Sequence, residues 1–261
     1  MPFRFEEIAY QAELDRHESP EFEEEAYKLC GEVPETRVSK IQELRDMIYA
    51  RGECQPPRMD DSFLLRFLRA RRFVPARAHR LMVRYCQFRE QNPYIWRDVD
   101  WYGMRRVGNL FEGVLYDRPD TGRLLLCRLG KWNPDTTPVE DLIRGAFLML
   151  EIGIMQPKLQ YAFPVHQRGV HVVNCSRVFE TLFYVFKRLA PRDDLWRRVY
   201  FHGSDMNSLH RYIDPECLPT RYGGKRQPTS LYTWLTKVKQ YKNKSFDDDI
   251  SQLGYSCDYY E

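Results

Sequence analysis

Arginine is the residue type in this chain that is best suited to bind a ligand, because its side chains are numerous and closely spaced. A guanidinium presents parallel N–H donors that match two oxygens of a phosphate. A stretch rich in arginine and free of carboxylates therefore favours an anionic partner: a phosphoinositide headgroup, a membrane surface or nucleic acid. Two other interpretations are a solvated helix surface and pairing with the acidic segment 1–34. No aspartate or glutamate interrupts the eight arginines, which are Arg66, Arg69, Arg71, Arg72, Arg77, Arg80, Arg84 and Arg89.

Side chains for catalysis or metal binding follow no recognisable pattern. The sequence contains no GxSxG, HExxH or GxGxxG motif. Its seven cysteines include no CxxC pair, which is typical of reduced thiols in a reducing compartment. His166 and His171 have no cysteine or carboxylate at ligand spacing, and His202 near Asp205 is typical of a histidine that ends a strand. We therefore expect neither an enzyme nor a bound metal or cofactor.

The composition is that of a globular protein. The chain has 261 residues, of which 43% are hydrophobic and 30% charged, and this excludes collagen-like, low-complexity and disulfide-scaffold proteins. Its formal net charge of only +3 argues against nucleic acid as the partner. The first residues lack a signal-peptide core, and the longest apolar run, 145–155, contains Glu151 and is too short for a bilayer. These observations predict a soluble cytoplasmic protein.

The elements that carry the arginines are predicted to be helices. Apolar residues recur at helical spacing over 37–51, and Gly52 ends that helix. Asp61 or Ser62 is expected to cap the next helix, and Pro75 suits the first turn of a third. The pattern predicts a helical N-terminal domain over residues 35–97.

Strands and helices alternate in the second part of the chain. Strands are predicted near 113–116, 123–129, 169–174 and 199–202, the third of them buried on both faces because it is almost wholly apolar. A capping box and a proline predict a helix over 138–156, and a second helix follows near 178–186. This alternation indicates an α/β domain over 98–225, followed by a partly ordered tail over 226–261.

Several segments, in the same order, resemble the CRAL-TRIO lipid-transfer family. They are Asp61-Ser-Phe-Leu-Leu-Arg-Phe-Leu-Arg-Ala-Arg-Arg-Phe73, Phe163-Pro-Val with Gly169-Val-His-Val-Val-Asn174, Phe201-His-Gly-Ser-Asp205, and Asp214-Pro-Glu-Cys-Leu-Pro-Thr-Arg-Tyr-Gly-Gly224. The sequence is most similar to the branch of alpha-tocopherol transfer protein-like and clavesin-like members. The resemblance implies a non-enzymatic monomer that carries one hydrophobic lipid, such as a tocopherol or a retinoid, and docks on phosphoinositide-bearing membranes, endosomal ones among them.

The resemblance also assigns roles to individual residues. It implies phosphoinositide contacts at Arg71, Arg168 and Arg198, whereas two other basic positions of that set are His166 and Asp194 here. The implied lid is a helix over 177–188. The implied ligand contacts are Ile143, Ala146, Phe147 and Leu150 on the pocket wall, Phe163 and Val165 after it, and Val178, Phe179, Leu182, Phe183 and Phe186 on the lid.

One departure from the family pattern concerns the ligand pocket. Residues 156–160 lead directly into Tyr161-Ala-Phe-Pro164, where the family has a further sheet strand and helices. Roughly thirty to forty residues are missing, and the short connection cannot replace a parallel crossover of about a dozen residues. We therefore expect a smaller or open pocket and impaired lipid transfer. The alternative is a membrane-surface or protein-interaction module that keeps the basic helices and carries no ligand.

Overall fold

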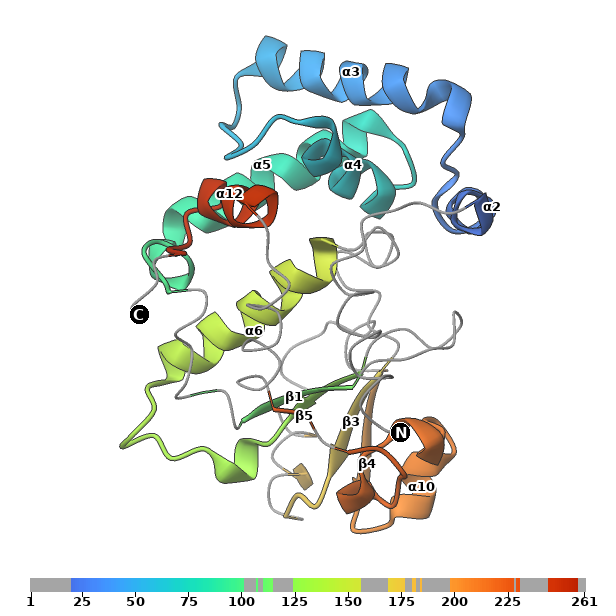
Figure 1. Cartoon of the computed structure of the whole chain (residues 1–261), viewed down its shortest axis with the longest axis vertical. Helices are drawn as coiled ribbons and strands as arrows, with labels where there is room; N and C mark the ends of the chain where they lie inside the picture. Colours follow the sequence, from blue (N-terminus) through green and yellow to red (C-terminus); the bar gives the residue numbers. More distant parts are fainter. Residues whose placement is uncertain are drawn as a thin grey trace. The chain divides into compact units, whose positions relative to one another are not determined.

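In the computed structural model the chain forms two compact units (Figure 1). The helical unit contains residues 1–115, 125–164 and 229–261, and the small α/β unit contains 116–124 and 165–228. Within them, the described residues are 20–100, 107, 110–114, 124–155, 169–176, 180–181, 184, 198–227, 229–230 and 244–257.

Among the described residues of its N-terminal part, the helical unit contains four α-helices: α2 (Pro20–Cys30), α3 (Pro34–Arg51), α4 (Asp61–Ala70) and α5 (Pro75–Gln91). A short 3-10 helix, η1 (Pro93–Ile95), follows them. Proline occupies the first position of α3 and of α5, where its missing N–H costs no helical hydrogen bond. Gly52 ends α3 in the left-handed conformation with φ of 59°, and its N–H bonds to the Ile48 carbonyl. The predicted helical N-terminal part is confirmed.

The cap of α4 differs from the prediction. Asp60, rather than Asp61 or Ser62, accepts the backbone N–H of Phe63 at 3.1 Å, and Asp61 is already the first helical residue. Burial acts to raise the pKa of Asp60, but hydrogen bonds from Arg58 and Ser62 outweigh it and hold the pKa at about 2. The carboxylate is thus charged at neutral pH, which suits a helix N-terminus.

α3 lies across α4 and α5 and buries the main hydrophobic core against them (Figure 1). Leu44, Leu64, Leu68 and Met82 are among the side chains with no exposed surface. Each side chain of this size stabilises the fold by roughly 1.5–3 kcal/mol when it leaves water. The apolar faces of these helices therefore hold the arginine-bearing segment in place.

The described part of the helical unit also contains a small sheet and a further long helix. Strands β1 (Phe111–Val114), β2 (Leu124–Cys127) and β5 (Thr229–Ser230) form a sheet in the order β2-β1-β5, with β1 antiparallel to β5. The predicted helix near 138–156 is confirmed as α6 (Val139–Met155), and a 3-10 turn, η2 (Leu129–Lys131), precedes it. No helix in the described part of the chain is long and apolar enough to cross a membrane.

The C-terminal segment, predicted to be a partly ordered tail, contributes to the core. Its helix α12 (Lys244–Gln252) lies beside α5 (Figure 1), and an Arg89 side-chain N–H donates to the Leu253 carbonyl. Ile250, Leu253 and Tyr255 are buried in the same hydrophobic cluster as α3, α4 and α5. Residues 244–257 are therefore an integral part of the helical unit.

The small α/β unit is built on two parallel strands, β3 (Val170–Val173) and β4 (Val199–Gly203), with Val170 opposite Val199. A short helix, α10 (Met206–His210), and two 3-10 turns, η3 (Pro215–Cys217) and η4 (Thr220–Tyr222), follow β4. The prediction that the third strand is buried on both faces is wrong, because all four residues of β3 are only half-buried. Among the described strands β3 has one neighbour, β4, which leaves it less covered than an interior strand.

A chain of hydrogen bonds joins two histidines and a serine inside this unit. His171 Nδ1 lies 3.0 Å from His202 Nε2, and His202 Nδ1 lies 2.9 Å from Ser208 Oγ. Asp205 does not form this chain; its carboxylate caps α10 by accepting the backbone N–H groups of Asn207 and Ser208. His202 therefore occupies a structural position at the end of β4, as predicted.

Stability of the small α/β unit is expected to fall in mild acid. Burial lowers the pKa of both His171 and His202; His202 lowers that of His171 further, whereas Asp205 opposes the shift at His202. The unfolded chain therefore binds more protons below about pH 6.5, so stability present above that pH is lost as it falls, by up to about 1.4 kcal/mol per pH unit for each histidine. Hydrogen exchange of the β3 and β4 amides at about pH 7.5 and about pH 5.5, corrected for intrinsic rates, measures this loss.

Replacing one partner provides the control for that experiment. His202→Gln removes a titrating ring and should weaken the pH dependence, whereas His210→Gln, in the same unit but outside the hydrogen-bonded chain, should leave it unchanged. Equal protection of β3 and β4 at both pH values in the unsubstituted protein would contradict the prediction.

Candidate functional site

The eight arginines between residues 66 and 89 divide into two groups. Arg66, Arg69 and Arg89 are buried or half-buried and bind other parts of the helical unit. The second group lies at the turn between α4 and α5 and along α5, is exposed apart from the half-buried Arg71, and forms no ion pair with any described residue. Its members are Arg71, Arg72, Arg77, Arg80 and Arg84.

Arg69 pairs with the acidic N-terminal segment, as one of the sequence-based interpretations proposed. Its Nε and Nη2 donate to the two carboxylate oxygens of Glu32 at 2.8 and 2.9 Å, and both side chains are almost fully buried. Arg37 Nε also lies 2.7 Å from Glu32. A two-pronged contact of this kind satisfies both charges away from water, so Arg69 holds α4 against the start of α3 and is not available to a ligand.

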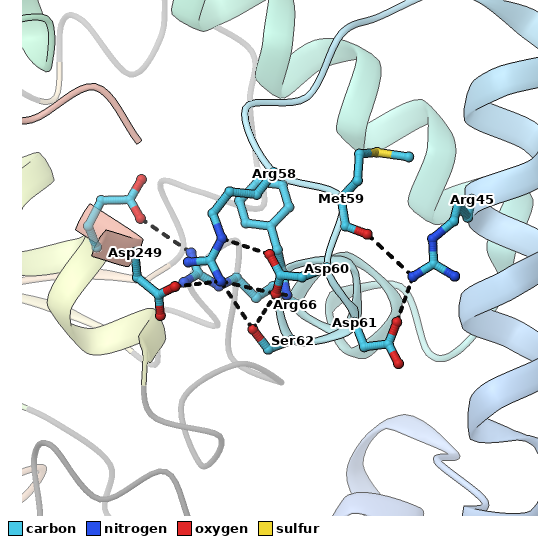
Figure 2. Close-up of polar contacts among 10 residues, drawn as sticks. Arg45, Arg58, Met59, Asp60, Asp61, Ser62, Arg66 and Asp249 are labelled. Carbon is cyan, nitrogen blue, oxygen red and sulfur yellow. Dashed lines mark hydrogen bonds and ion pairs between the residues drawn. The ribbon is translucent and has the colours of Figure 1, made fainter. Parts of the chain in front are cut away.

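A second pair of arginines is enclosed near the N-terminus of α4, and Figure 2 shows Arg58 and Arg66 there. Arg66 Nη1 lies 3.5 Å from the Glu151 carboxylate on α6, and Arg58 Nη2 lies 2.9 Å from Asp249 on α12. Both guanidinium groups lie over the Phe63 ring. Burial lowers the pKa of Arg66, and the Glu151 charge opposes that shift. These contacts connect α4 to two segments that are distant in the sequence.

Arg58 is a structural residue that sequence reasoning missed. It lies outside the carboxylate-free stretch and next to two aspartates, so its surroundings gave no signal of burial. Arg45 is a further example: its guanidinium binds Asp61 at 2.6 Å and the Met59 carbonyl at 3.3 Å (Figure 2). Ion pairs between different elements leave no local pattern in a single sequence.

The exposed arginines form the candidate site. Arg71 follows α4 directly, and burial and then the nearby positive charge of Arg84 lower its pKa. Two neighbouring guanidinium groups also attract an anion that neutralises both charges. Arg77, Arg80 and Arg84 follow one another at helical spacing on α5 and continue this charge along the helix. The geometry suits an extended anionic surface or a phosphorylated headgroup.

The residues predicted to form the pocket wall lie partly within the core. Ile143, Ala146 and Phe147 are half-buried side chains of α6 that pack against the hydrophobic cluster of the helical unit, and Leu150 is also half-buried. The Phe147 ring stacks on Phe88 with centroids 5.5 Å apart. The structure thus assigns these side chains a packing role, and their contact with a ligand stays a prediction.

Most other predicted site residues fall outside the described residues. Arg198 is exposed, and its carbonyl accepts the Val170 N–H at 2.7 Å. In the predicted lid, Glu180, Thr181 and Tyr184 are helical, and the exposed Tyr184 ring lies 6.0 Å from Phe201. The positions outside the described part are Phe163, Val165, Arg168, Val178, Phe179, Leu182, Phe183 and Phe186, together with His166 and Asp194.

The described residues include no group of three or more His, Cys, Asp or Glu side chains that could hold a metal ion.

A helical unit with an arginine-rich turn and an α/β unit with parallel strands match the architecture that the sequence resemblance implies. The exposed arginines are therefore the candidate site for an anionic partner.

Comparison with known proteins identifies the family. The CRAL/TRIO N-terminal domain matches residues 34–84, and the CRAL/TRIO domain matches residues 158–224. The chain is 30% identical to Clavesin-1 of Rattus norvegicus over 97% of its own length and 82% of that protein. It is 29% identical to Clavesin-2 of Homo sapiens over 93% of its length and 84% of that protein. The chain belongs to the CRAL/TRIO family of lipid-binding and transfer proteins.

The same comparisons bear on the length of the chain. The match to Clavesin-1 of Rattus norvegicus runs over 291 aligned positions but includes 97% of the 261 residues, about 253, which leaves about 38 positions without a counterpart here. The match to Clavesin-2 of Homo sapiens runs over 280 positions and includes 93% of the chain, about 243 residues, which leaves about 37. Both numbers fall within the thirty to forty residues expected from the sequence.

Removing the Glu32 charge is expected to destabilise the helical unit strongly. Glu32→Gln breaks the buried two-pronged ion pair with Arg69, and breaking a buried ion pair typically costs about 3–5 kcal/mol. Urea unfolding followed by circular dichroism measures the change in the free energy of unfolding. The matched control is Glu43→Gln, which breaks an exposed pair with Lys40 and should change stability by less than about 1 kcal/mol. Equal effects of the two substitutions would contradict the assignment.

Proposed function

We propose that this protein binds one hydrophobic lipid, such as a tocopherol or a retinoid, and transfers it between membranes, docking through phosphoinositides. In this proposal it is a cytoplasmic, non-enzymatic monomer that associates transiently with endosomal or other phosphoinositide-bearing membranes. Membership of the CRAL/TRIO family supports the lipid-binding part. The single observation that carries the docking part is the group of exposed arginines around Arg71 and Arg84 that lack an ion-pair partner among the described residues.

The arginines provide the physical basis of docking. A basic side chain near an anionic membrane surface contributes about 1 kcal/mol to binding, and the contribution decays over about one Debye length. Arg77, Arg80 and Arg84 lie on exposed positions of one rigid helix, so they can approach the surface together. Arginine also contacts phosphate groups in a two-pronged manner, which favours phosphorylated headgroups over a uniformly charged surface.

We further propose that the internal shortening impairs transport of the lipid. About 38 positions of the Clavesin-1 match have no counterpart in this chain, and the sequence places the gap near Gln160. Among the described strands, β2 and β3 end two separate sheets and each has one neighbour. An interior strand pairs on both sides, so its loss would leave the neighbouring strands with unpaired backbone groups.

The second candidate function is a membrane-surface or protein-interaction module that carries no ligand. The packing of Phe147 against Phe88 and Trp96 favours it, because a side chain engaged in the core is less able to line a ligand pocket. Both functions share the arginine surface and differ only in the presence of a bound lipid.

Neutralising two arginines is expected to weaken docking on phosphoinositide vesicles. The double substitution Arg71→Gln/Arg84→Gln removes two charges worth about 1 kcal/mol each, so affinity should fall about thirty-fold. Sedimentation with phosphatidylcholine vesicles that contain a few per cent of a phosphoinositide measures the binding. The matched control is Arg97→Gln, an exposed arginine beyond the other end of α5, which should have little effect. Unchanged binding of the double variant would rule out this docking surface.

Extraction of lipids from the purified protein is expected to distinguish the two functions. A lipid carrier should contain one apolar species in a stoichiometric amount, identified by mass spectrometry of a solvent extract. A shortened pocket should give less than one equivalent, and a ligand-free module should give none while still binding vesicles. A full equivalent of lipid with normal exchange kinetics would contradict the proposed impairment, and the Arg71→Gln/Arg84→Gln variant serves as a control because its lipid content should not change.

A further inference from the structure

One apolar side chain is exposed among the arginines of the turn between α4 and α5. Val74 is 37% exposed, and from Arg66 to Arg84, a stretch that the structure describes throughout, it is the only large apolar side chain that is exposed rather than buried or half-buried. Arg72 and Arg77, on either side of it in the sequence, are exposed too. Single exposed apolar residues are common at protein surfaces, so Val74 is informative only through its position.

Val74 occupies the N-cap of α5, where valine is unfavourable. Its backbone is extended, with φ of −99° and ψ of 100°, and no side chain caps the helix there. Asparagine, aspartate or serine at this position would accept one of the free N–H groups of the first turn, whereas valine cannot. Val33 has the equivalent position before α3 but is half-buried. The exposed valine is therefore particular to the arginine-rich turn.

The backbone of the turn holds Val74 in a defined place. Arg72 and Phe73 both have left-handed φ angles, of 53° and 52°, which is uncommon for residues other than glycine. The Phe73 side chain is buried in the core, and its N–H bonds to the Leu68 carbonyl at 2.8 Å. The Val74 N–H bonds to the Arg71 carbonyl at 3.2 Å. Because the turn is ordered before it binds anything, a partner does not have to order it.

We propose that the turn between α4 and α5 inserts Val74 into the interfacial layer of an anionic bilayer, while Arg72 and Arg77 bind lipid phosphates around it. The inference rests on the proposed docking function and adds to it an apolar contact and the element that makes it. Segments that bind a membrane surface place basic side chains at the headgroups and apolar ones at the boundary of the acyl chains. A soluble polyanion offers no acyl layer, so an exposed valine between exposed arginines favours the bilayer.

The first test separates membrane contact from folding. Val74→Asn supplies a favoured N-cap, so the midpoint of thermal unfolding should stay the same or rise. Affinity for phosphatidylcholine vesicles that contain a few per cent of a phosphoinositide should nevertheless fall about five-fold, because the apolar contact is lost. The matched control is Val139→Asn, which changes an exposed valine at the start of α6 and should leave vesicle affinity unchanged.

A second test measures insertion directly in the full chain. Val74→Trp places an indole, which prefers the membrane interface, at the tip of the turn. Vesicles of the same composition made with brominated acyl chains should quench this variant more strongly than the unsubstituted protein with its five native tryptophans. The variant should also bind the vesicles more tightly. Val139→Trp should show neither the extra quenching nor the gain in affinity.

Binding of the free headgroup distinguishes insertion from an effect on the arginines. Val74→Asn should not change the affinity for soluble inositol trisphosphate. An equal loss of affinity for the free headgroup and for vesicles would overturn the proposal, as would a loss of vesicle binding that is accompanied by a lower unfolding midpoint.

The failure of insertion and the failure of docking give different results. If Arg71→Gln/Arg84→Gln weakens vesicle binding while Val74→Asn does not and Val74→Trp is not quenched, insertion is wrong and docking through arginines stands. If the unsubstituted protein does not bind these vesicles, or binds single-stranded RNA more tightly, both proposals are wrong.

Discussion

The helical unit depends on the neutralisation of positive charge that is buried with α4. Every residue of this helix from Phe63 to Arg69 is buried, so the helix has no solvent face over that length and encloses two arginines. An unpaired buried charge would cost several kcal/mol, and carboxylates must therefore approach from outside the helix. Glu32 and Glu151 approach from the α2–α3 connection and from α6. Charge pairing thus brings together segments that hydrophobic contacts alone would not align.

This constraint explains for which arginines the sequence predicted the exposure correctly and for which it did not. The apolar residues of α4 have the spacing of one helical face. The remaining positions, Arg66 and Arg69 among them, were therefore expected to be solvated, to bind an anionic partner or to pair with the acidic segment 1–34. They are buried because Glu32 in the α2–α3 connection pairs with Arg69 and Glu151 on α6 pairs with Arg66. On α5 the same reasoning holds better: Arg77, Arg80 and Arg84 are exposed. A helical period identifies one buried face, but it does not show whether the opposite face is covered.

Local signals determined how much of the fold could be predicted. The proline at the start of α5 and the residues around Thr137 placed α5 and α6 within about two residues, because helix ends depend on neighbouring residues. The contribution of α12 was not predicted, since its sequence is mostly polar and contains few buried residues, such as Ile250.

The positions of the buried charges also bear on what the shortened chain retains. The carboxylates that neutralise α4 and its neighbour Arg58 come from Glu32, Glu151 and Asp249, all outside the segment near Gln160 where the sequence departs from the family. A gap at that point therefore removes none of the contacts that orient the exposed arginines. Its consequences should fall on the sheet and on the proposed lipid transport, and the proposed docking surface should remain. The two effects are separate because the residues that stabilise the arginine-bearing helices lie at other positions in the chain than the gap. The chemistry of the lipid does not enter this argument.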